Sequence, residues 1–174
     1  MSAGEFHLTQ AIDIAATPEQ VWAAIVEQPS AWWGAPYQLL DGASTFELPL
    51  VAGGAVIERL GEATALWGHV SICEPGRSYG WIGQMGMGAA AWGEVRYALE
   101  PTGSGTRVTV THDSALLWAD GDEQGADAAA GARASYDYGW ADLNARLRAF
   151  VEIGAEHGTR GSNAEPAFEF RASS

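Results

Sequence analysis

Three side chains capable of acid–base chemistry occur in stretches whose alternation is typical of β-strands: Glu58, Tyr97 and His112. Histidine titrates near neutral pH, so His112 is the strongest candidate for proton transfer, although it can equally be a strand-end residue capped by Asp113. Glu58 shares a strand face with Val56, so its carboxyl group would lie either buried or at the rim of the interior. These three residues are the candidate catalytic groups.

Aromatic side chains are the second notable feature, since the sequence contains 8 Trp, 5 Tyr and 5 Phe. Alternation places several of them on strand faces whose other residues are apolar, and such faces point inward. There, rings could surround a mostly apolar ligand while a few polar groups orient it. The alternative is a packed core whose polar tips are satisfied. The expected ligand-binding residues are Trp33, Tyr79, Trp81, Tyr97, His112, Tyr136 and Trp140.

A helix over residues 132–153 is expected to face these strands. Apolar residues recur along it at spacings of three and four, which places them in one stripe. They are Tyr136, Trp140, Leu143, Leu147 and Phe150. No proline interrupts the helix, and Gly154 can end it. A stripe of this length requires a long, curved apolar surface.

The preceding chain has the pattern of an antiparallel sheet. It predicts a strand over 6–15, a helix that Thr17 caps, and a short helical turn over 30–34. Further strands are expected over 46–48, 55–60, 64–73, 78–82, 92–99 and 106–112. Residues 83–90 and 116–131 resemble connections, the second a solvated loop or a mobile lid. One domain is expected over 1–156, followed by a loosely attached or disordered tail over 157–174.

Composition limits the partners. The chain has 174 residues, with 22 Asp and Glu against 9 Lys and Arg, a formal net charge of −13. This charge repels phosphate backbones and anionic lipid surfaces, so neither nucleic acid nor a membrane is expected as a partner. A single cysteine, no apolar run of membrane-spanning length and no recognisable signal peptide favour a cytoplasmic protein. We expect a monomer or a homodimer, between which the sequence does not decide.

Motifs that would indicate a cofactor or a metal are absent or out of context. Residues 86–91 imitate a dinucleotide fingerprint but lead into a strand instead of opening a helix. Four scattered histidines and Cys73 have no metal-ligand spacing, and neither a phosphate loop nor a nucleophile elbow is present. We therefore expect no cofactor and no metal.

The order of these elements, together with local motifs, resembles the START-like or Bet v 1-like superfamily, also labelled SRPBCC. Within it, the sequence is most similar to the branch named after the activator of Hsp90 ATPase homologue. The shared motifs cover nearly the whole of residues 6–154. They are residues 12–22 (IDIAATPEQVW), Trp32-Trp33-Gly34, Gly53-Gly54, Gly68-His69-Val70 with Glu74-Pro75, Leu99-Glu100-Pro101, residues 105–112 (GTRVTVTH), and Gly139-Trp140 with Leu147 and Glu152.

The resemblance implies an α+β helix-grip fold. A curved antiparallel sheet of about seven strands would wrap around a long C-terminal helix and leave an apolar cavity, with two short helices after the first strand. Members bind lipids, hormones or polyketides; some are cyclases or dehydratases, and one group assists a chaperone. No catalytic motif is common to the superfamily, so the fold implies a cavity and not a reaction.

The sequence leaves three functions open. The first is binding of a small apolar or aromatic molecule. The second is a polyketide cyclase- or dehydratase-type enzyme, in which aromatic walls fold the substrate and His112, Tyr97 or Glu58 moves protons. The third is a chaperone-associated interaction module, which needs an exposed apolar patch that no segment clearly supplies. Of the three functions, binding requires the fewest features of the sequence, since it needs neither a catalytic set of residues nor an exposed apolar patch.

Overall fold

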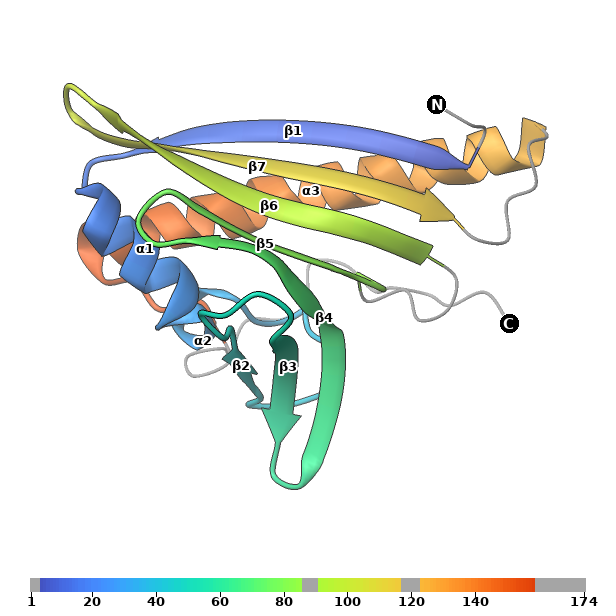
Figure 1. The fold of residues 1–174 in the computed structure, drawn as a ribbon, viewed down its shortest axis with the longest axis horizontal. Coiled ribbons are helices and arrows are strands. Elements are labelled where there is room, and N and C mark those ends of the chain that lie inside the picture. The colour runs from blue at the N-terminus through green and yellow to red at the C-terminus, as the bar shows by residue number, and fades with distance from the viewer. Residues whose placement is uncertain (1–3, 86–90, 117–122, 159–174) are drawn as a thin grey trace.

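The computed structural model describes residues 4–85, 91–116 and 123–158. A seven-stranded antiparallel sheet in the order β1-β7-β6-β5-β4-β3-β2 curves around the long helix α3 (Glu123–Ile153), as Figure 1 shows. Two short helices, α1 (Pro18–Val26) and α2 (Pro29–Trp32), follow the first strand. The strands are β1 (Glu5–Ile14), β2 (Thr45–Glu47), β3 (Ala55–Leu60), β4 (Ala63–Glu74), β5 (Ser78–Gly83), β6 (Ala91–Thr102) and β7 (Gly105–Leu116). The expected helix-grip architecture is confirmed.

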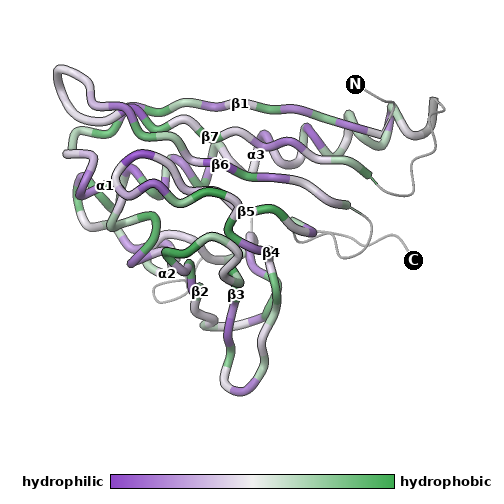
Figure 2. Tube along the Cα trace, viewed as in Figure 1, coloured by the Kyte–Doolittle hydropathy of each residue, from purple (hydrophilic) through white to green (hydrophobic). Residues whose placement is uncertain are grey.

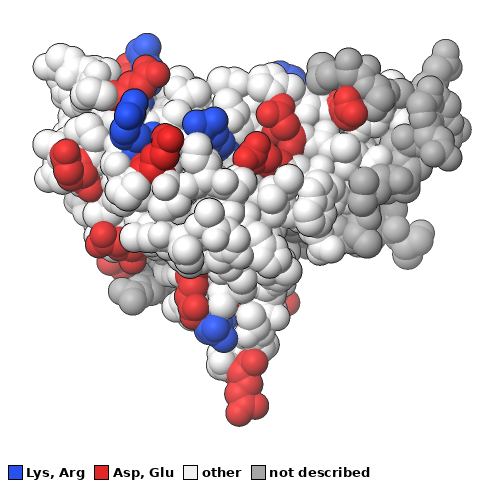
Figure 3. Space-filling view, in the orientation of Figure 1, with Lys and Arg blue, Asp and Glu red and all other residues white. Residues whose placement is uncertain are grey.

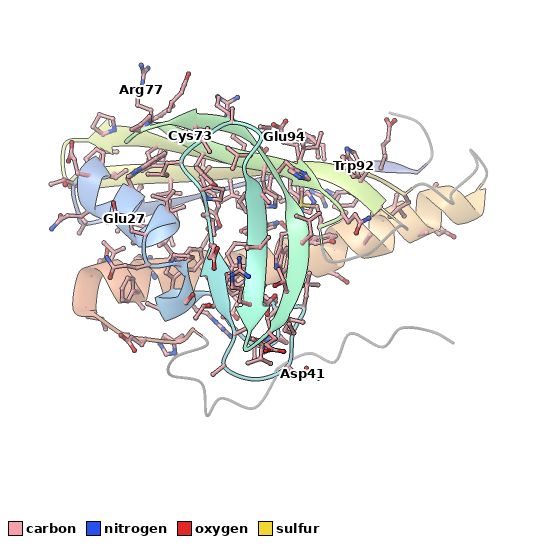
Figure 4. All side chains as sticks on the ribbon, turned by 60° about the horizontal axis from the view of Figure 1, so that its bottom comes forward. Glu27, Asp41, Cys73, Arg77, Trp92 and Glu94 are labelled. Carbon is pink, nitrogen blue, oxygen red and sulfur yellow. The ribbon has the colours of Figure 1, made fainter. Side chains whose placement is uncertain are left out.

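The alternation of the strands decides which side chains reach the interior. Hydrophobic and hydrophilic residues alternate along them (Figure 2). On β6, Val95, Tyr97 and Leu99 are buried. Trp92 and Glu94 of the same strand lie on the side of the sheet away from α3 (Figure 4). Since side chains of a strand point alternately to its two faces, the buried set faces the helix.

Helix α1 begins as the sequence predicts. The Thr17 side chain accepts a hydrogen bond from the backbone N–H of Gln20, and the Gln20 side chain accepts one from the backbone N–H of Thr17. This capping box satisfies N–H groups that the first turn leaves without helical partners, and Pro18 suits the first helical position. The helix directs Val21 and Ile25 into the core, where both are fully buried.

Helix α3 is longer at its N-terminus than predicted. It begins at Glu123, so the expectation of a connection through residue 131 is wrong from Glu123 onward. Residues 127–132 are rich in alanine, the residue with the highest helix propensity, and buried Ala129 packs against Ala91 and Leu116. Residues 117–122, the remainder of the expected loop or lid, lie outside the described residues. At the other end, Gly154 ends the helix with a φ of 69°, as expected.

The hairpin strands β6 and β7 also extend further than the sequence pattern indicated. Because β7 continues to Leu116, His112 lies within the strand, and its interpretation as a strand-end residue capped by Asp113 is wrong. The Asp113 carboxylate instead pairs with His7 of β1, and both side chains are exposed. His112 itself is fully buried on the opposite face.

Acidic side chains dominate the surface charge. Figure 3 shows Asp and Glu spread over this face with fewer Lys and Arg between them. Two of the arginines are already paired with carboxylates, Arg59 with Glu47 and Arg107 with Asp13. Within the described residues, no helix combines the length and apolar character that a membrane span requires.

Candidate functional site

The register of the sheet gathers polar and aromatic side chains on the inner face of three central strands. Trp81 pairs across the sheet with Val95, and Val95 pairs with His112. In the adjacent row, Tyr79 pairs with Tyr97. Alternate residues of a strand share a face, so Trp81, Tyr97 and His112 are arranged around the small side chain of Val95. All three are at most 1% exposed.

Helix α3 and the segment after α2 supply the opposite side. The Trp140 ring lies edge-on to the rings of Tyr97 and His112, at centroid separations of 6.0 and 6.2 Å. Trp33 lies 5.8 Å from Trp81 and 6.0 Å from Trp140. Tyr136 contacts His112 at 4.4 Å. We call Trp33, Trp81, Tyr97, His112, Tyr136 and Trp140 the aromatic cluster; its members come from five separate elements or connecting segments.

Trp33 is held in place by a close fit between its loop and α3. The indole N–H of Trp33 donates to the backbone carbonyl of Tyr37, and the Tyr37 ring lies against Gly139. A Cβ at position 139 would lie 3.2 Å from that ring, which would have to move by a few tenths of an ångström to admit it. Arg146 adds a hydrogen bond to the carbonyl of Ala35 and stacks over the Tyr37 ring at 5.3 Å.

Trp140 determines the state of the His112 ring. Its indole N–H donates to Nδ1 of His112 at 3.1 Å, so Nδ1 acts as the acceptor. Burial lowers the pKa of His112 from its ordinary 6.5 to about 4, although the nearby Asp113 carboxylate opposes this shift. The ring is therefore neutral at pH 7. With Nδ1 accepting, its proton is on Nε2, and that N–H points to no protein acceptor among the described residues.

Two further polar atoms of the aromatic cluster share this property. The indole Nε1 of Trp81 and the hydroxyl of Tyr97 are buried without a hydrogen-bond partner in the described part of the chain. Burial also raises the pKa of the Tyr97 hydroxyl, which stays protonated at neutral pH. The side-chain oxygen of Gln38, in the loop after α2, is also buried without a partner within the described residues. Such groups are rare in native proteins because an unmade buried hydrogen bond is costly.

The remaining expected ligand-binding residues have satisfied polar atoms. The Tyr136 hydroxyl donates to the carbonyl of Met85 at 2.6 Å. The Tyr79 hydroxyl donates to the carbonyl of Pro49 at 3.0 Å, and its ring lies between Trp22 and Trp81. Tyr79 thus contacts the aromatic cluster through its ring but offers it no free polar atom.

Glu58 differs from Trp81, Tyr97 and His112 because its buried polar atoms have hydrogen-bond partners. It is fully buried, and its two carboxylate oxygens accept four hydrogen bonds. The donors are the backbone N–H groups of Leu39 and Leu40, the Ser44 hydroxyl and the Trp67 indole N–H. Of the two positions expected for this carboxyl group, buried or at the rim, the structure shows the buried one. Its bonds fix the loop that leads into β2.

Two residues near the site were missing from the sequence-based set. The Phe6 ring stacks on Tyr136 at 5.6 Å and lies edge-on to His112 at 5.2 Å. Asn144 of α3 is buried and donates to Gln10 of β1 at 3.3 Å. Strand alternation does place Phe6 on an inward face, but its contact with α3 depends on the pairing of β1 with β7, which no local pattern specifies.

A curved antiparallel sheet that holds a C-terminal helix against aromatic and polar side chains defines a START-like helix-grip protein. The family profile described as polyketide cyclase/dehydrase and lipid transport matches residues 5–148. The chain belongs to this family, and with it to the SRPBCC superfamily. No protein of curated function matches the sequence.

Solved structures with this fold are numerous. A Staphylococcus saprophyticus protein matches with a TM-score of 0.59 at 18% identity, covering 87% of this chain and 95% of the other. The Aha1 dimer from Colwellia psychrerythraea matches with a TM-score of 0.57 at 20% identity, covering 86% of this chain and 98% of the Aha1 chain. DynU16, from the dynemicin biosynthetic locus, matches with a TM-score of 0.58 at 16% identity, covering 87% of this chain and 49% of DynU16. At these identities the likeness establishes the fold alone.

Proposed function

We propose that this protein binds a small aromatic or apolar molecule between the inner face of the sheet and α3, in contact with the aromatic cluster. One observation carries the proposal: Trp81, Tyr97 and His112 each bury a polar atom that has no partner among the described residues. A folded protein retains such groups at a cost in stability, and sites for ligands are where that cost is expected. Aromatic walls with a few convergent polar groups are typical of small-molecule sites.

The protonation states of the candidate catalytic residues favour binding over acid–base catalysis. A histidine with a pKa of about 4 is a weak base at neutral pH. The four donors on Glu58 occupy both carboxylate oxygens, which suits a structural role. Tyr97 and the Nε2–H group of His112 are better placed to donate hydrogen bonds than to remove protons.

A cyclase- or dehydratase-type enzyme using the same site is the alternative, supported by the family description and by the fold likeness to DynU16. In that function, the Tyr97 and His112 donors would polarise a carbonyl group of the substrate. The second alternative, a chaperone-associated module of the Hsp90-activator branch, has the fold likeness to Aha1 as its support.

We further propose that the protein is cytoplasmic and that residues 1–156 form one domain.

Indole N–H resonances in a ¹H–¹⁵N spectrum test the site directly. The probe is 2-acetylnaphthalene, an aromatic ketone, titrated into the full-length protein. We expect the Trp81, Trp140 and Trp33 indole signals to shift together. The Trp32 signal should shift less, because its indole N–H donates to the carbonyl of Ala24, although its ring contacts Trp33 at 5.8 Å. Shifts confined to the exposed Trp92 would contradict the proposal.

Mass spectrometry of the same samples separates a binder from an enzyme. A binder returns its ligand unchanged. Turnover of a polyketone substrate that is lost in His112→Gln, while the variant stays folded, would favour the enzyme instead. Absence of any indole shift or thermal stabilisation with aromatic compounds would bring the interaction module forward, because a ligand specific for the folded state must raise the melting temperature.

A further inference from the structure

We infer that the ligand presents acceptor oxygens to the aromatic cluster, as an aromatic or conjugated ketone does, and that it is not recognised through donor groups of its own. This inference rests on the proposed function and specifies the ligand class. It follows from which atoms are left unpartnered and from the tautomer that Trp140 imposes on His112.

Two of the three unpartnered atoms can only donate. An indole Nε1 always carries a hydrogen and has no acceptor lone pair, so Trp81 is a donor. A neutral imidazole has one donor and one acceptor nitrogen, and the Trp140 N–H already occupies the acceptor, Nδ1. The Nε2 atom of His112 is therefore the donor. The Tyr97 hydroxyl can donate or accept, and Tyr97 comes from β6, the strand between those of Trp81 and His112, one row along the sheet.

The surroundings keep these donors fixed and uncharged. Around His112, the rings of Phe6, Tyr136 and Trp140 contact the imidazole, and none carries a charge. The Asp113 carboxylate, whose charge acts on His112, lies on the opposite face and is paired with His7. Low polarity strengthens each hydrogen bond that a ligand oxygen would accept. A ligand hydroxyl or amine that donates a hydrogen bond would find only the Tyr97 oxygen as an acceptor among these three groups.

An isosteric pair of probes tests the inference. 2-Acetylnaphthalene carries a carbonyl oxygen where 2-isopropenylnaphthalene carries a methylene group, and the two have nearly the same shape. We expect the ketone to bind about tenfold more tightly or better, because the alkene leaves buried donors without a partner. The preference should shrink in Tyr97→Phe and in Trp81→Phe. It should persist in Tyr138→Phe and Trp92→Phe, which make the same changes at exposed positions.

The outcomes separate this inference from the proposed function. Equal affinities for ketone and alkene would overturn the acceptor inference and leave binding intact. Binding of neither probe would overturn both. A tighter alkene, or a preference unchanged in Tyr97→Phe and Trp81→Phe, would also overturn the inference.

Ring-nitrogen NMR of the wild-type protein provides a test that needs no variant. At pH 7, we expect the His112 signals of a neutral ring protonated on Nε2, with that N–H shifting much further downfield at saturation with 2-acetylnaphthalene, which accepts its hydrogen bond, than with 2-isopropenylnaphthalene. A ring protonated on Nδ1 would overturn the inference. Trp140 acts here as a positioning residue: Trp140→Phe removes its N–H and should return His112 to a mixture of tautomers, even where the probe still binds.

Discussion

Two buried polar groups in this interior differ in one respect that bears on function. On β3, next to the edge strand β2, the Glu58 carboxylate accepts four hydrogen bonds and holds the loop that enters β2. In the aromatic cluster, three polar atoms are equally buried and have no partner in the described part of the chain. The two regions meet at Trp33, a member of the aromatic cluster, whose ring lies 5.4 Å from that of Trp67, the indole that donates to Glu58.

The comparison shows that burial alone does not identify a functional residue. Glu58 looked like a candidate acid or base because it is a carboxyl group on an apolar strand face. Both of its oxygens already accept hydrogen bonds from protein donors, an arrangement that suits a structural role, since a buried polar group is tolerated when it is hydrogen-bonded. His112 has half of its hydrogen-bonding capacity unused, and that unused half is what a ligand could bind.

We expect the largest loss of stability from a substitution at Glu58, whose carboxylate oxygens both accept hydrogen bonds. In Glu58→Gln, an amide N–H₂ group replaces one carboxylate oxygen and faces two of the four donors. A hydrogen bond to a charged acceptor contributes about 2 kcal/mol, so we expect the free energy of unfolding to fall by about 4 kcal/mol. Urea denaturation measures this loss. Glu47→Gln, on the adjacent strand, is the matched control.

The ion pair of Glu47 with Arg59 is exposed, so substitution of Glu47 should cost about 0.5 kcal/mol or less. The ketone preference of the aromatic cluster should survive in Glu58→Gln wherever the variant remains folded. A loss for Glu58→Gln no larger than that for Glu47→Gln would remove the distinction between the two regions.

The next effect concerns pH and belongs to His112. Its folded-state pKa, about 4, lies below its ordinary value of 6.5, so the unfolded chain takes up the proton first. The stability that depends on a neutral His112 is therefore fully present above pH 6.5, and it is lost as the pH falls from 6.5 toward 4. A shift of this size corresponds to about 3 kcal/mol. Unfolding free energies measured between pH 7 and 4 should show this loss on top of the contributions of carboxylates.

His112→Gln should remove that part of the pH dependence, since glutamine does not titrate. His69→Gln, which replaces an exposed histidine, serves as the control for the substitution itself. If both variants keep the slope of the wild type, the buried His112 is not the group that titrates, and the assignment of a neutral donor ring fails with it.

Much of the fold was accessible from the sequence because its signals are local. The alternation of the strands, the Thr17 capping box and the stripe of Tyr136, Trp140 and Leu147 each depend on neighbouring residues, and the structure confirms all three. The N-terminal part of α3 was missed because its helical pattern is alanine-rich and lacks large apolar residues. Its partners, Ala91 and Leu116, are distant in sequence.

The site was only partly predictable for the same reason. Strand alternation gave Trp81, Tyr97 and His112 a common inward face, and the register then brought them around Val95. Which polar atoms find partners depends on contacts between distant segments. The Trp140 N–H on His112, the Pro49 carbonyl at Tyr79 and the four donors of Glu58 follow from no spacing rule.

The smallest expected effect is the most direct measure of the difference between satisfied and unsatisfied groups. Tyr79 and Tyr97 are fully buried partners across β5 and β6, yet only the Tyr79 hydroxyl has an acceptor, the Pro49 carbonyl. Tyr79→Phe should lower the free energy of unfolding by about 1 kcal/mol, the usual net contribution of a hydrogen bond. Tyr97→Phe should leave it unchanged or raise it, because it removes a buried hydroxyl that has no protein partner. Denaturant titrations of both variants without ligand give the comparison. An equal loss in the two would mean that the Tyr97 hydroxyl is already satisfied in the free protein, and the interior would then be a packed core with no polar atom reserved for a ligand.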